Sequence, residues 1–259
     1  MSEGLPTAGN PAMNTKKMRV ELSRDGVSFS FVCFDNPQTR STCRRIFDGS
    51  AYRIVPFLQE VRTIVDIGAN VGAASIYFAL TYPAALVHAF EADPDSHQLL
   101  VENAQAFANL RPHGFGLYDR DCRKTLHRGL LTPGTSSVGR HYANADRGVE
   151  VALHDAGGTF RRLDIAAIDI LKIDTEGCEV PILRSALELV LGVRALYLEY
   201  HSEGDRRVID ALLADTHILF SGAVSGPHRG ELCYVARSAF PSPAHLAAEE
   251  IRLEGGEAP

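Results

Sequence analysis

The stretch TIVDIGANVGAASIYFAL, residues 63–80, decides the fold of this chain. Thr63–Ile67 is a compact β-branched run and predicts a buried strand, and the small and apolar residues of 70–80 predict a helix. Between them, Gly68 allows a tight turn and lets a ligand approach bare backbone. Gly72 lets the helix pack close to the strand. The stretch therefore predicts a strand–turn–helix unit of the kind that holds a nucleotide.

Short apolar runs and helical patterns alternate around this unit. We predict further strands at 86–90, 113–118, 168–173 and 195–200, helices at 93–109, 181–192 and 205–214, a hairpin at 19–35 around Asp25-Gly26, and a closing antiparallel pair at 217–220 and 232–236. Such alternation predicts an α/β fold with a doubly wound, mainly parallel sheet and an antiparallel strand near the C-terminus.

Composition divides the chain into four segments. Residues 1–18 form a predicted flexible tail, 19–62 a hairpin with a helical lead-in, 63–237 the main domain, and 238–259 a second tail. Within the main domain, the glycine-rich residues 119–163 break the alternation. We predict an insertion of loops and short hairpins there, on the substrate side of the sheet. Its residues 134–137, with His141 and Tyr142, offer polar groups for a lid over a pocket.

The overall composition excludes several classes of partner. The chain carries 26 Lys+Arg against 32 Asp+Glu, a net charge of −6, and it lacks the basic stripe that non-specific nucleic-acid binding needs. No run approaches the roughly 20 apolar residues that span a bilayer, and the N-terminus lacks the pattern of a signal peptide. Five scattered cysteines fit reduced thiols. We expect a cytoplasmic protein that binds a small-molecule acceptor, neither nucleic acid nor membrane; the oligomeric state, a homodimer included, stays open.

An acidic residue ends the second strand of the predicted nucleotide unit. Glu91 follows Gly72 by nineteen residues, and a carboxylate there can accept both hydroxyls of a ribose. A nicotinamide dinucleotide usually requires GxGxxG at the turn, whereas the spacing here is GxxxG. Asp66, beside the loop, would repel pyrophosphate but suit the cationic S-adenosylmethionine. The residues favour this methyl donor over the dinucleotide.

A second acidic block, KIDTEGCE at 172–179, ends a later strand. Asp174 is expected at the carboxyl end of that strand, next to the ligand crevice, with Glu176 two residues on. The fifth predicted strand adds Glu199 and His201. Methyl transfer to a hydroxyl requires a base or a metal ion to remove the proton. The candidate catalytic residues are therefore Asp174, Glu176 and His201.

Two roles compete for the groups of this block. Asp174, Glu199 and His201 could share a divalent cation, magnesium or manganese, because hard oxygen ligands suit both ions and one imidazole is compatible with manganese. Alternatively, His201 is a general base oriented by Glu199 or Glu176, with no metal. The sequence leaves both roles open.

Four motifs resemble, in this order, the FkbM family of S-adenosylmethionine-dependent methyltransferases: VDIGANVGAASIYFA, AFEADP with a following Asn103, ILKIDTEGCE and LYLEYH. The resemblance runs from about residue 63 to 236. It implies a class I, Rossmann-like methyltransferase fold. It also implies donor contacts at the following residues: Asp66, Gly68, Asn70 and Glu91, with Gly72 completing the turn. By analogy with this fold, Asp119 or Asp121 faces the adenine.

The resemblance further implies an O-methyltransferase acting on sugars or secondary metabolites, as in natural product biosynthesis. We therefore expect O-methylation of a hydroxyl on a small polar acceptor. Two alternatives stay open: a nicotinamide-dependent oxidoreductase and a non-catalytic module that binds the donor. A nucleic-acid methyltransferase is disfavoured by the acidic charge and by the absence of an Asn/Asp-Pro-Pro-Tyr-type segment to receive a flipped base.

Overall fold

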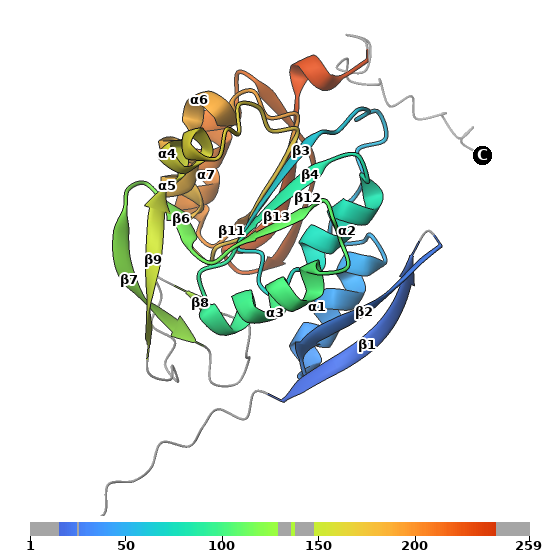
Figure 1. Ribbon diagram of the computed structural model, residues 1–259. Coiled ribbons are helices and arrows are strands. Elements are labelled where there is room, and N and C mark those ends of the chain that lie inside the picture. The colour runs from blue at the N-terminus through green and yellow to red at the C-terminus, as the bar shows by residue number, and fades with distance from the viewer. Residues whose placement is uncertain (1–15, 25, 129–135, 138–147, 242–259) are drawn as a thin grey trace, which may run out of the picture.

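A seven-stranded sheet forms the centre of the computed structural model, which describes residues 16–24, 26–128, 136–137 and 148–241 (Figure 1). The strand order is β12-β13-β11-β10-β3-β4-β5. The strands are β3 (Thr63–Ile67), β4 (Leu86–Phe90), β5 (Leu110–His113), β10 (Ile170–Ile173), β11 (Ala195–Tyr200), β12 (His217–Gly226) and β13 (Arg229–Ala236). The five neighbouring strands β11, β10, β3, β4 and β5 run parallel, and β13 is antiparallel to both of its neighbours. The predicted doubly wound sheet with an antiparallel strand near the C-terminus is confirmed.

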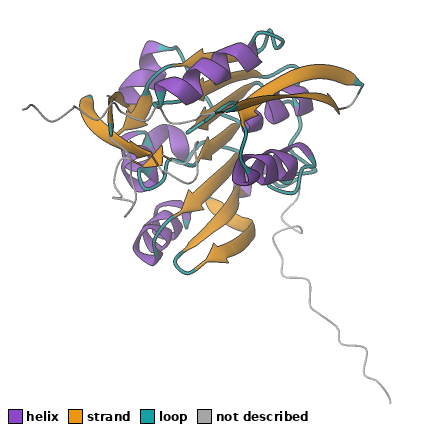
Figure 2. Cartoon of the chain, turned by 90° about the horizontal axis from the view of Figure 1, so that it is seen from below, coloured by secondary structure: helices purple, strands orange, loops and turns teal. Residues whose placement is uncertain are grey.

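Helices cover both faces of this sheet, as Figures 1 and 2 show. One face carries α1 (Pro37–Phe47), α2 (Ala73–Thr81) and α3 (Pro94–Ala104), and the other carries α4 (Ala156–Arg162), α5 (Glu179–Ser185), α6 (Leu187–Val190) and α7 (Glu203–Leu213). A separate apolar cluster fills the space on each face. All four residues of β10 are buried, which explains why the central strands read as continuous apolar runs. Within the described residues, no helix is long and apolar enough to cross a membrane.

The predicted N-terminal hairpin is confirmed. Strands β1 (Lys17–Arg24) and β2 (Val27–Phe34) pair antiparallel, with Arg24 opposite Val27. This register leaves two residues for the turn, and Gly26 takes the positive φ of 81° that such a turn requires. The inner face of β2 packs into the same apolar cluster as α1, α2 and α3.

A buried asparagine joins the hairpin to the nucleotide unit. The side-chain amide of Asn103, in α3, donates to the carbonyls of Val32 and Val71, each at 2.8 Å. Its carbonyl oxygen accepts the Val32 N–H, also at 2.8 Å. Val71 belongs to the turn between β3 and α2, so one side chain holds both the hairpin and that turn. All three bonds are buried, where leaving a polar group unpaired is costly.

The insertion builds a sheet of its own with the order β6-β9-β7-β8. Its strands are β6 (Gly116–Tyr118), β7 (Cys122–Arg128), β8 (Ser136–Ser137) and β9 (Val149–Asp155). The prediction of one strand over 113–118 is therefore wrong. The chain leaves the central sheet after His113, because Phe115 packs against Phe90 and His154, with ring centroids at 5.6 and 4.7 Å. Of the predicted lid, residues 134, 135, His141 and Tyr142 lie outside the described residues.

Several element boundaries differ from the predictions. Helix α2 begins at Ala73 rather than residue 70, because Asn70 and Gly72 are in the left-handed region with φ of 52° and 90°. Helix α3 has the predicted Asp93 N-cap, whose side chain accepts the Asp95 N–H, but it ends at residue 104. The helix predicted over 181–192 is the α5–α6 pair, and β12 and β13 both extend beyond the predicted 217–220 and 232–236.

A few residues of each predicted tail belong to the described fold. Residues 17 and 18 belong to β1. After β13, a short 3-10 helix, η1 (Arg237–Ala239), leads to Phe240, whose ring packs 4.8 Å from that of Phe57. The described part of the chain therefore stays on the fold beyond residue 238.

Candidate active site

A cavity of about 660 Å³ opens at the carboxyl ends of β3 and β10. The chain leads from β3 towards β4 on one side and from β10 towards β11 on the other. Such a switch point is where open α/β sheets bind ligands, and the volume suits a small molecule. The cavity has two distinct walls, one at the nucleotide unit and one at α1 and the β12–β13 pair.

The first wall, which we call the donor side, is built on the glycine turn. Gly68 has a φ of 79°, and a Cβ on it would lie 1.9 Å from the backbone oxygen of Asp174. The amides of Gly68 and Ala69 both donate to the carbonyl of Phe90 at 3.0 Å. Only glycine fits there, because the Asp174 backbone occupies the place of a side chain; Gly68 itself lines the cavity. Asn70 also lines the cavity, whereas Gly72 serves helix packing: its Cβ would meet Leu100 at 2.7 Å.

Glu91 is held rigidly at the end of β4. One carboxylate oxygen accepts the Asn70 N–H and the other accepts the Asp93 N–H, each at 2.7 Å. Burial raises the pKa of Glu91 to about 7. Each carboxylate oxygen has a second lone pair, so both can also accept a hydroxyl from the cavity. Glu91 lines the cavity, and this arrangement fits a ribose.

Asp66 does not reach the cavity. It is fully buried, with 0% of its surface exposed, and its Oδ1 lies 2.9 Å from Nζ of Lys172. Its Oδ2 accepts the Ser75 hydroxyl at 2.6 Å. The expected direct contact between Asp66 and a cationic donor is therefore corrected: its charge faces Lys172, and it supports the turn from behind.

The residues expected at the adenine also lie elsewhere. Asp119 is exposed, 3.3 Å from Nη1 of its neighbour Arg120, and Asp121 accepts the backbone N–H of Asp155 at 2.8 Å. Neither lines the cavity, which corrects the expectation for both. Next to Glu91 the lining is apolar: Ala92, Gly116, Leu117, Leu126 and Leu153. A flat aromatic base fits such a slot. Leu117, Leu126 and Leu153 come one each from β6, β7 and β9, and no pattern in the sequence marked them as one slot.

Two carboxyl groups meet between the donor side and the second wall. Ile173 of β10 is paired with Leu198 of β11, so the next residues, Asp174 and Glu199, follow side by side at the cavity. Burial raises the pKa of Glu199 to about 9, and the neighbouring Asp174 carboxylate adds to the shift. The pair therefore holds a proton at neutral pH, as expected for two carboxyl groups that cannot both ionise.

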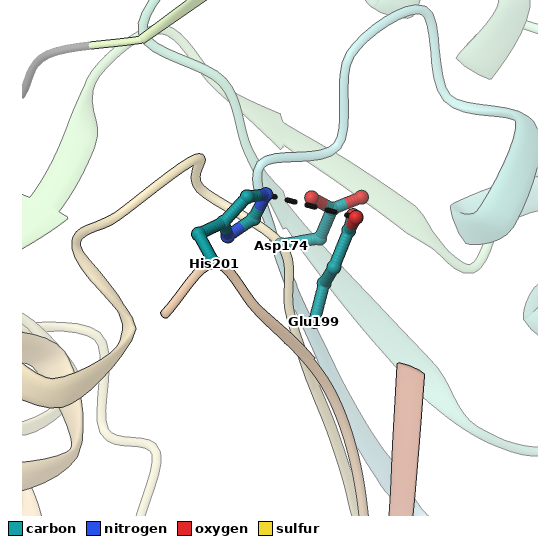
Figure 3. Close-up of side chains that lie close together, drawn as sticks. All are labelled: Asp174, Glu199 and His201. Atoms are coloured by element: carbon teal, nitrogen blue, oxygen red, sulfur yellow. Dashed lines mark ion pairs between the residues drawn. The ribbon is translucent and has the colours of Figure 1, made fainter. Parts of the chain in front are cut away.

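His201 lies behind this pair, with a side chain that is 0% exposed and does not line the cavity (Figure 3). Its Nε2 is 3.1 Å from Glu176 and 3.6 Å from Glu199, and its Nδ1 is 3.4 Å from Glu179. Burial disfavours the charged ring, but the carboxylates of Glu176 and Glu179 outweigh it and raise the pKa of His201 to about 10. A buried imidazolium cannot accept the acceptor's proton. The surroundings of the ring therefore favour a supporting role for His201, and its role as a catalytic base stays an untested prediction.

The three candidate metal ligands do come together. One potential ligand atom from each of Asp174, Glu199 and His201 lies within 4.8 Å of the others (Figure 3). A metal ligand must be deprotonated, however, and both ring nitrogens of His201 face carboxylates. The charges around the ring therefore fit a proton better than a divalent cation.

Glu176 and Glu179 shape the loop after β10. Glu176 lines the cavity with a positive φ of 55°, and its carboxylate lies 3.1 Å from Nη2 of Arg229. Glu179 is buried in the first turn of α5, and its Oε1 accepts the backbone N–H of Thr175 at 2.9 Å and of Gly177 at 3.1 Å. The sequence alone did not single out Glu179, whose role in closing the loop depends on these backbone contacts.

The second wall, which we call the acceptor side, consists of the lining residues of α1, residues 50–53 and the β12–β13 pair. Arg45 of α1 donates two hydrogen bonds to Glu231 of β13, at 2.9 and 3.0 Å. Tyr197 donates its hydroxyl to the carbonyl of Arg53 at 2.6 Å. The insertion was expected on this side. Among the described residues of 119–163, those that line the cavity are the apolar-slot residues Leu126 and Leu153; residues 129–135 and 138–147 lie outside the described residues, so the substrate-side role of the insertion stays a prediction.

Known proteins are similar in sequence to the part of the chain that builds the donor side. A family model for the methyltransferase FkbM domain matches residues 66–218. "Methyltransferase sdnD" of Sordaria araneosa is 28% identical over 221 residues, 72% of this chain and 84% of that protein. "Methyltransferase 1" of Beauveria bassiana is 25% identical over 161 residues, 54% of this chain. The chain spans 64% of the length of the Beauveria protein.

Solved structures show a more distant similarity. Fibrillarin of Methanococcus jannaschii, a pre-rRNA processing protein, has 11% identity and a TM-score of 0.49, over 89% of this chain and 86% of that one. Fibrillarin of Aeropyrum pernix, in complex with S-adenosylmethionine, has 13% identity and a TM-score of 0.47, over 74% of each chain.

The family match covers more than half of the chain and contains the motifs that built the donor side. The sheet, with its single antiparallel strand β13 inside an otherwise parallel centre, has the class I methyltransferase arrangement. The chain belongs to the FkbM methyltransferase family and is an S-adenosylmethionine-dependent methyltransferase.

Proposed function

We propose that this enzyme methylates a hydroxyl group on a small, uncharged polar acceptor. The observation that carries the proposal is the Asp174–Glu199 carboxyl pair at the cavity, between the donor side and the acceptor side. S-adenosylmethionine supplies an activated methyl group on a sulfonium. The remaining task for the protein is to position a nucleophile and take its proton.

On the donor side, Gly68 and Asn70 would hold the donor through backbone, and Glu91 would accept its ribose hydroxyls. The support is that Gly68, Asn70 and Glu91 all line the cavity and that the Glu91 carboxylate is fixed by two backbone amides. The apolar slot at Leu117 and Leu153 would take the adenine.

In the proposed reaction, Asp174 takes the proton of the acceptor hydroxyl as its oxygen attacks the methyl carbon and the carbon–sulfur bond of the donor breaks. Glu199, which holds a proton at neutral pH, donates a hydrogen bond to Asp174 and keeps it oriented. Nζ of Lys172 lies 3.9 Å from Oδ2 of Asp174. Glu176 lines the same part of the cavity, but its pairing with Arg229 and His201 suits it to support rather than to proton transfer.

Two of the three arginines that line the acceptor side are paired with carboxylates, which supports an uncharged acceptor. Arg45 is paired with Glu231, and Arg229 with Glu176. Between these pairs the lining offers hydroxyl groups: Thr39, Thr42, Ser50, Ser221 and Ser225. Such a surface can bind several hydroxyls of a sugar or of a hydroxylated secondary metabolite.

The decisive experiment compares Asp174→Asn with wild type in two assays. Methyl transfer to a panel of glycosides and hydroxylated metabolites should fall by about 10²- to 10⁴-fold, as for loss of a general base. Affinity for S-adenosylhomocysteine should stay within a few-fold of wild type. Unchanged turnover in Asp174→Asn would refute the proposal.

A thermal shift assay with S-adenosylhomocysteine tests whether the Asp174–Glu199–His201 cluster holds protons or a metal ion. We propose that the Asp174–Glu199–His201 cluster holds protons, so adding magnesium or manganese should give no further stabilisation beyond that of the nucleoside. A metal-dependent increment that disappears in His201→Gln would instead establish a cation site.

A further inference from the structure

A buried lysine connects the donor side with the carboxyl pair. Lys172 of β10 is 3% exposed. Its Nζ lies 2.9 Å from Oδ1 of Asp66, donates to the carbonyl of Gly68 at 2.7 Å, and is 3.9 Å from Oδ2 of Asp174. Its burial opposes the charged form, but the Asp66 carboxylate outweighs it and raises the pKa of Lys172 above its usual value. The ammonium therefore stays charged inside the fold.

The parallel pairing of β10 with β3 explains this placement. Lys172 stands opposite Asp66 in the register, so both side chains leave the sheet on the same face. The longer lysine side chain passes beyond Asp66 and reaches the carbonyl two residues later in β3's turn. A shorter cation at this position could pair with Asp66 but could not reach Gly68.

The Gly68 turn has no side chain of its own to fix it. Its amide is held by the Phe90 carbonyl, and the space beside its Cα is filled by the Asp174 backbone. The remaining polar group is its carbonyl, which accepts from Lys172. Because a charged donor makes a stronger hydrogen bond than a neutral one, Lys172 fixes the orientation of the peptide that faces the cavity.

We propose that Lys172 is a positioning residue for the donor turn, and that its contact with Gly68 contributes to donor affinity separately from its ion pair with Asp66. The proposal concerns the chain's own residues on the donor side, so it holds whichever acceptor is methylated. A purely structural role, in which Lys172 only neutralises Asp66, makes a different prediction about donor affinity.

Two single variants separate these roles, because each breaks the ion pair but only one removes the Gly68 contact. Lys172→Met deletes the ammonium, whereas Asp66→Asn keeps it in place. Both should lower the melting temperature of the free protein, since a buried charge is left without its partner. Affinity for S-adenosylhomocysteine, measured by calorimetry well below both melting temperatures, should fall about 10- to 100-fold in Lys172→Met and only a few-fold in Asp66→Asn.

The double variant Asp66→Asn/Lys172→Met covers the case in which Lys172→Met fails to fold. Removing both charges should restore much of the melting temperature, but donor affinity should stay as low as in Lys172→Met. Wild-type affinity in the double variant, or equal affinity losses in the two single variants, would overturn the proposal. Since no acceptor enters these measurements, their outcome is independent of the proposed O-methylation.

Discussion

The two walls of the cavity are built from different parts of the chain and from different chemistry. The donor side lies within the family match at 66–218, and its contacts are a glycine turn, backbone amides and one fixed carboxylate. The acceptor side comes largely from α1, residues 50–53 and β13, all outside that match, and its contacts are charged and hydroxyl side chains. Under the proposed function, the part of the chain inside the family match holds the methyl donor, and elements outside the match select the acceptor.

The largest effect should come from filling the glycine turn. Gly68→Ala should abolish measurable binding of S-adenosylhomocysteine, because the added Cβ would lie 1.9 Å from the Asp174 oxygen. Gly26→Ala is the matched control: φ there is 81°, nearly the same as at Gly68, but a Cβ at Gly26 would meet nothing within 4 Å. Similar affinity losses in both variants would show that backbone strain, not the close approach, matters.

The carboxyl pair should affect turnover without affecting the donor side. In Glu199→Gln the amide can still donate a hydrogen bond to Asp174, so we expect a loss of kcat of about 10-fold, smaller than that of Asp174→Asn. Affinity for S-adenosylhomocysteine should be unchanged in a calorimetric titration. A greater loss in Glu199→Gln than in Asp174→Asn would exchange the roles of the two residues.

The Arg45–Glu231 pair tests whether the acceptor side can be changed alone. Arg45→Gln should raise KM for the acceptor by about 5- to 10-fold, the effect of losing one polar contact, and leave donor affinity unchanged. Arg19→Gln is the control. Arg19, on the N-terminal hairpin, forms a comparable exposed pair with Glu102 of α3, and neither residue lines the cavity. Both variants should keep the wild-type melting temperature, since exposed pairs add little stability.

The smallest effect is a pH dependence of donor binding at Glu91. Burial raises its pKa to about 7, so the free protein binds a proton there at pH 6 and releases it by pH 8. The ionised carboxylate accepts hydroxyls better, so S-adenosylhomocysteine should bind a few-fold more tightly at pH 8 than at pH 6. Glu91→Gln should remove this slope. A slope of the opposite sign would mean that the protonated form binds the ribose.

The parallel core and the donor turn could be predicted because both are local. The strands at 63–67, 86–90 and 195–200 are apolar runs with the predicted bounds, and Asp93-Pro94 starts a helix as expected. The glycine spacing is equally local, since φ and close packing act within a few residues.

The direction in which acidic and basic side chains face could not be predicted in the same way. Asp66 lies near the end of β3 and Asp174 directly follows β10. Lys172 pairs with Asp66 away from the cavity, whereas Asp174 lines it. His201 follows β11 yet is enclosed by three glutamates. These outcomes depend on contacts between strands and loops far apart in the chain, as does the Arg45–Glu231 pair on the acceptor side.

The three hydrogen bonds of Asn103 make the N-terminal hairpin an indicator of the donor turn. The Val32 N–H donates to the Asn103 side chain, which also donates to the Val71 carbonyl. Exchange of the Val32 amide proton with deuterium therefore requires that its hydrogen bond to Asn103 break. Saturation with S-adenosylhomocysteine should slow exchange at Val32, a residue outside the family match, more than at Phe29 in the same strand. Equal slowing of exchange at both amides would show that donor binding affects the whole hairpin and does not act through the Asn103 contact to the turn.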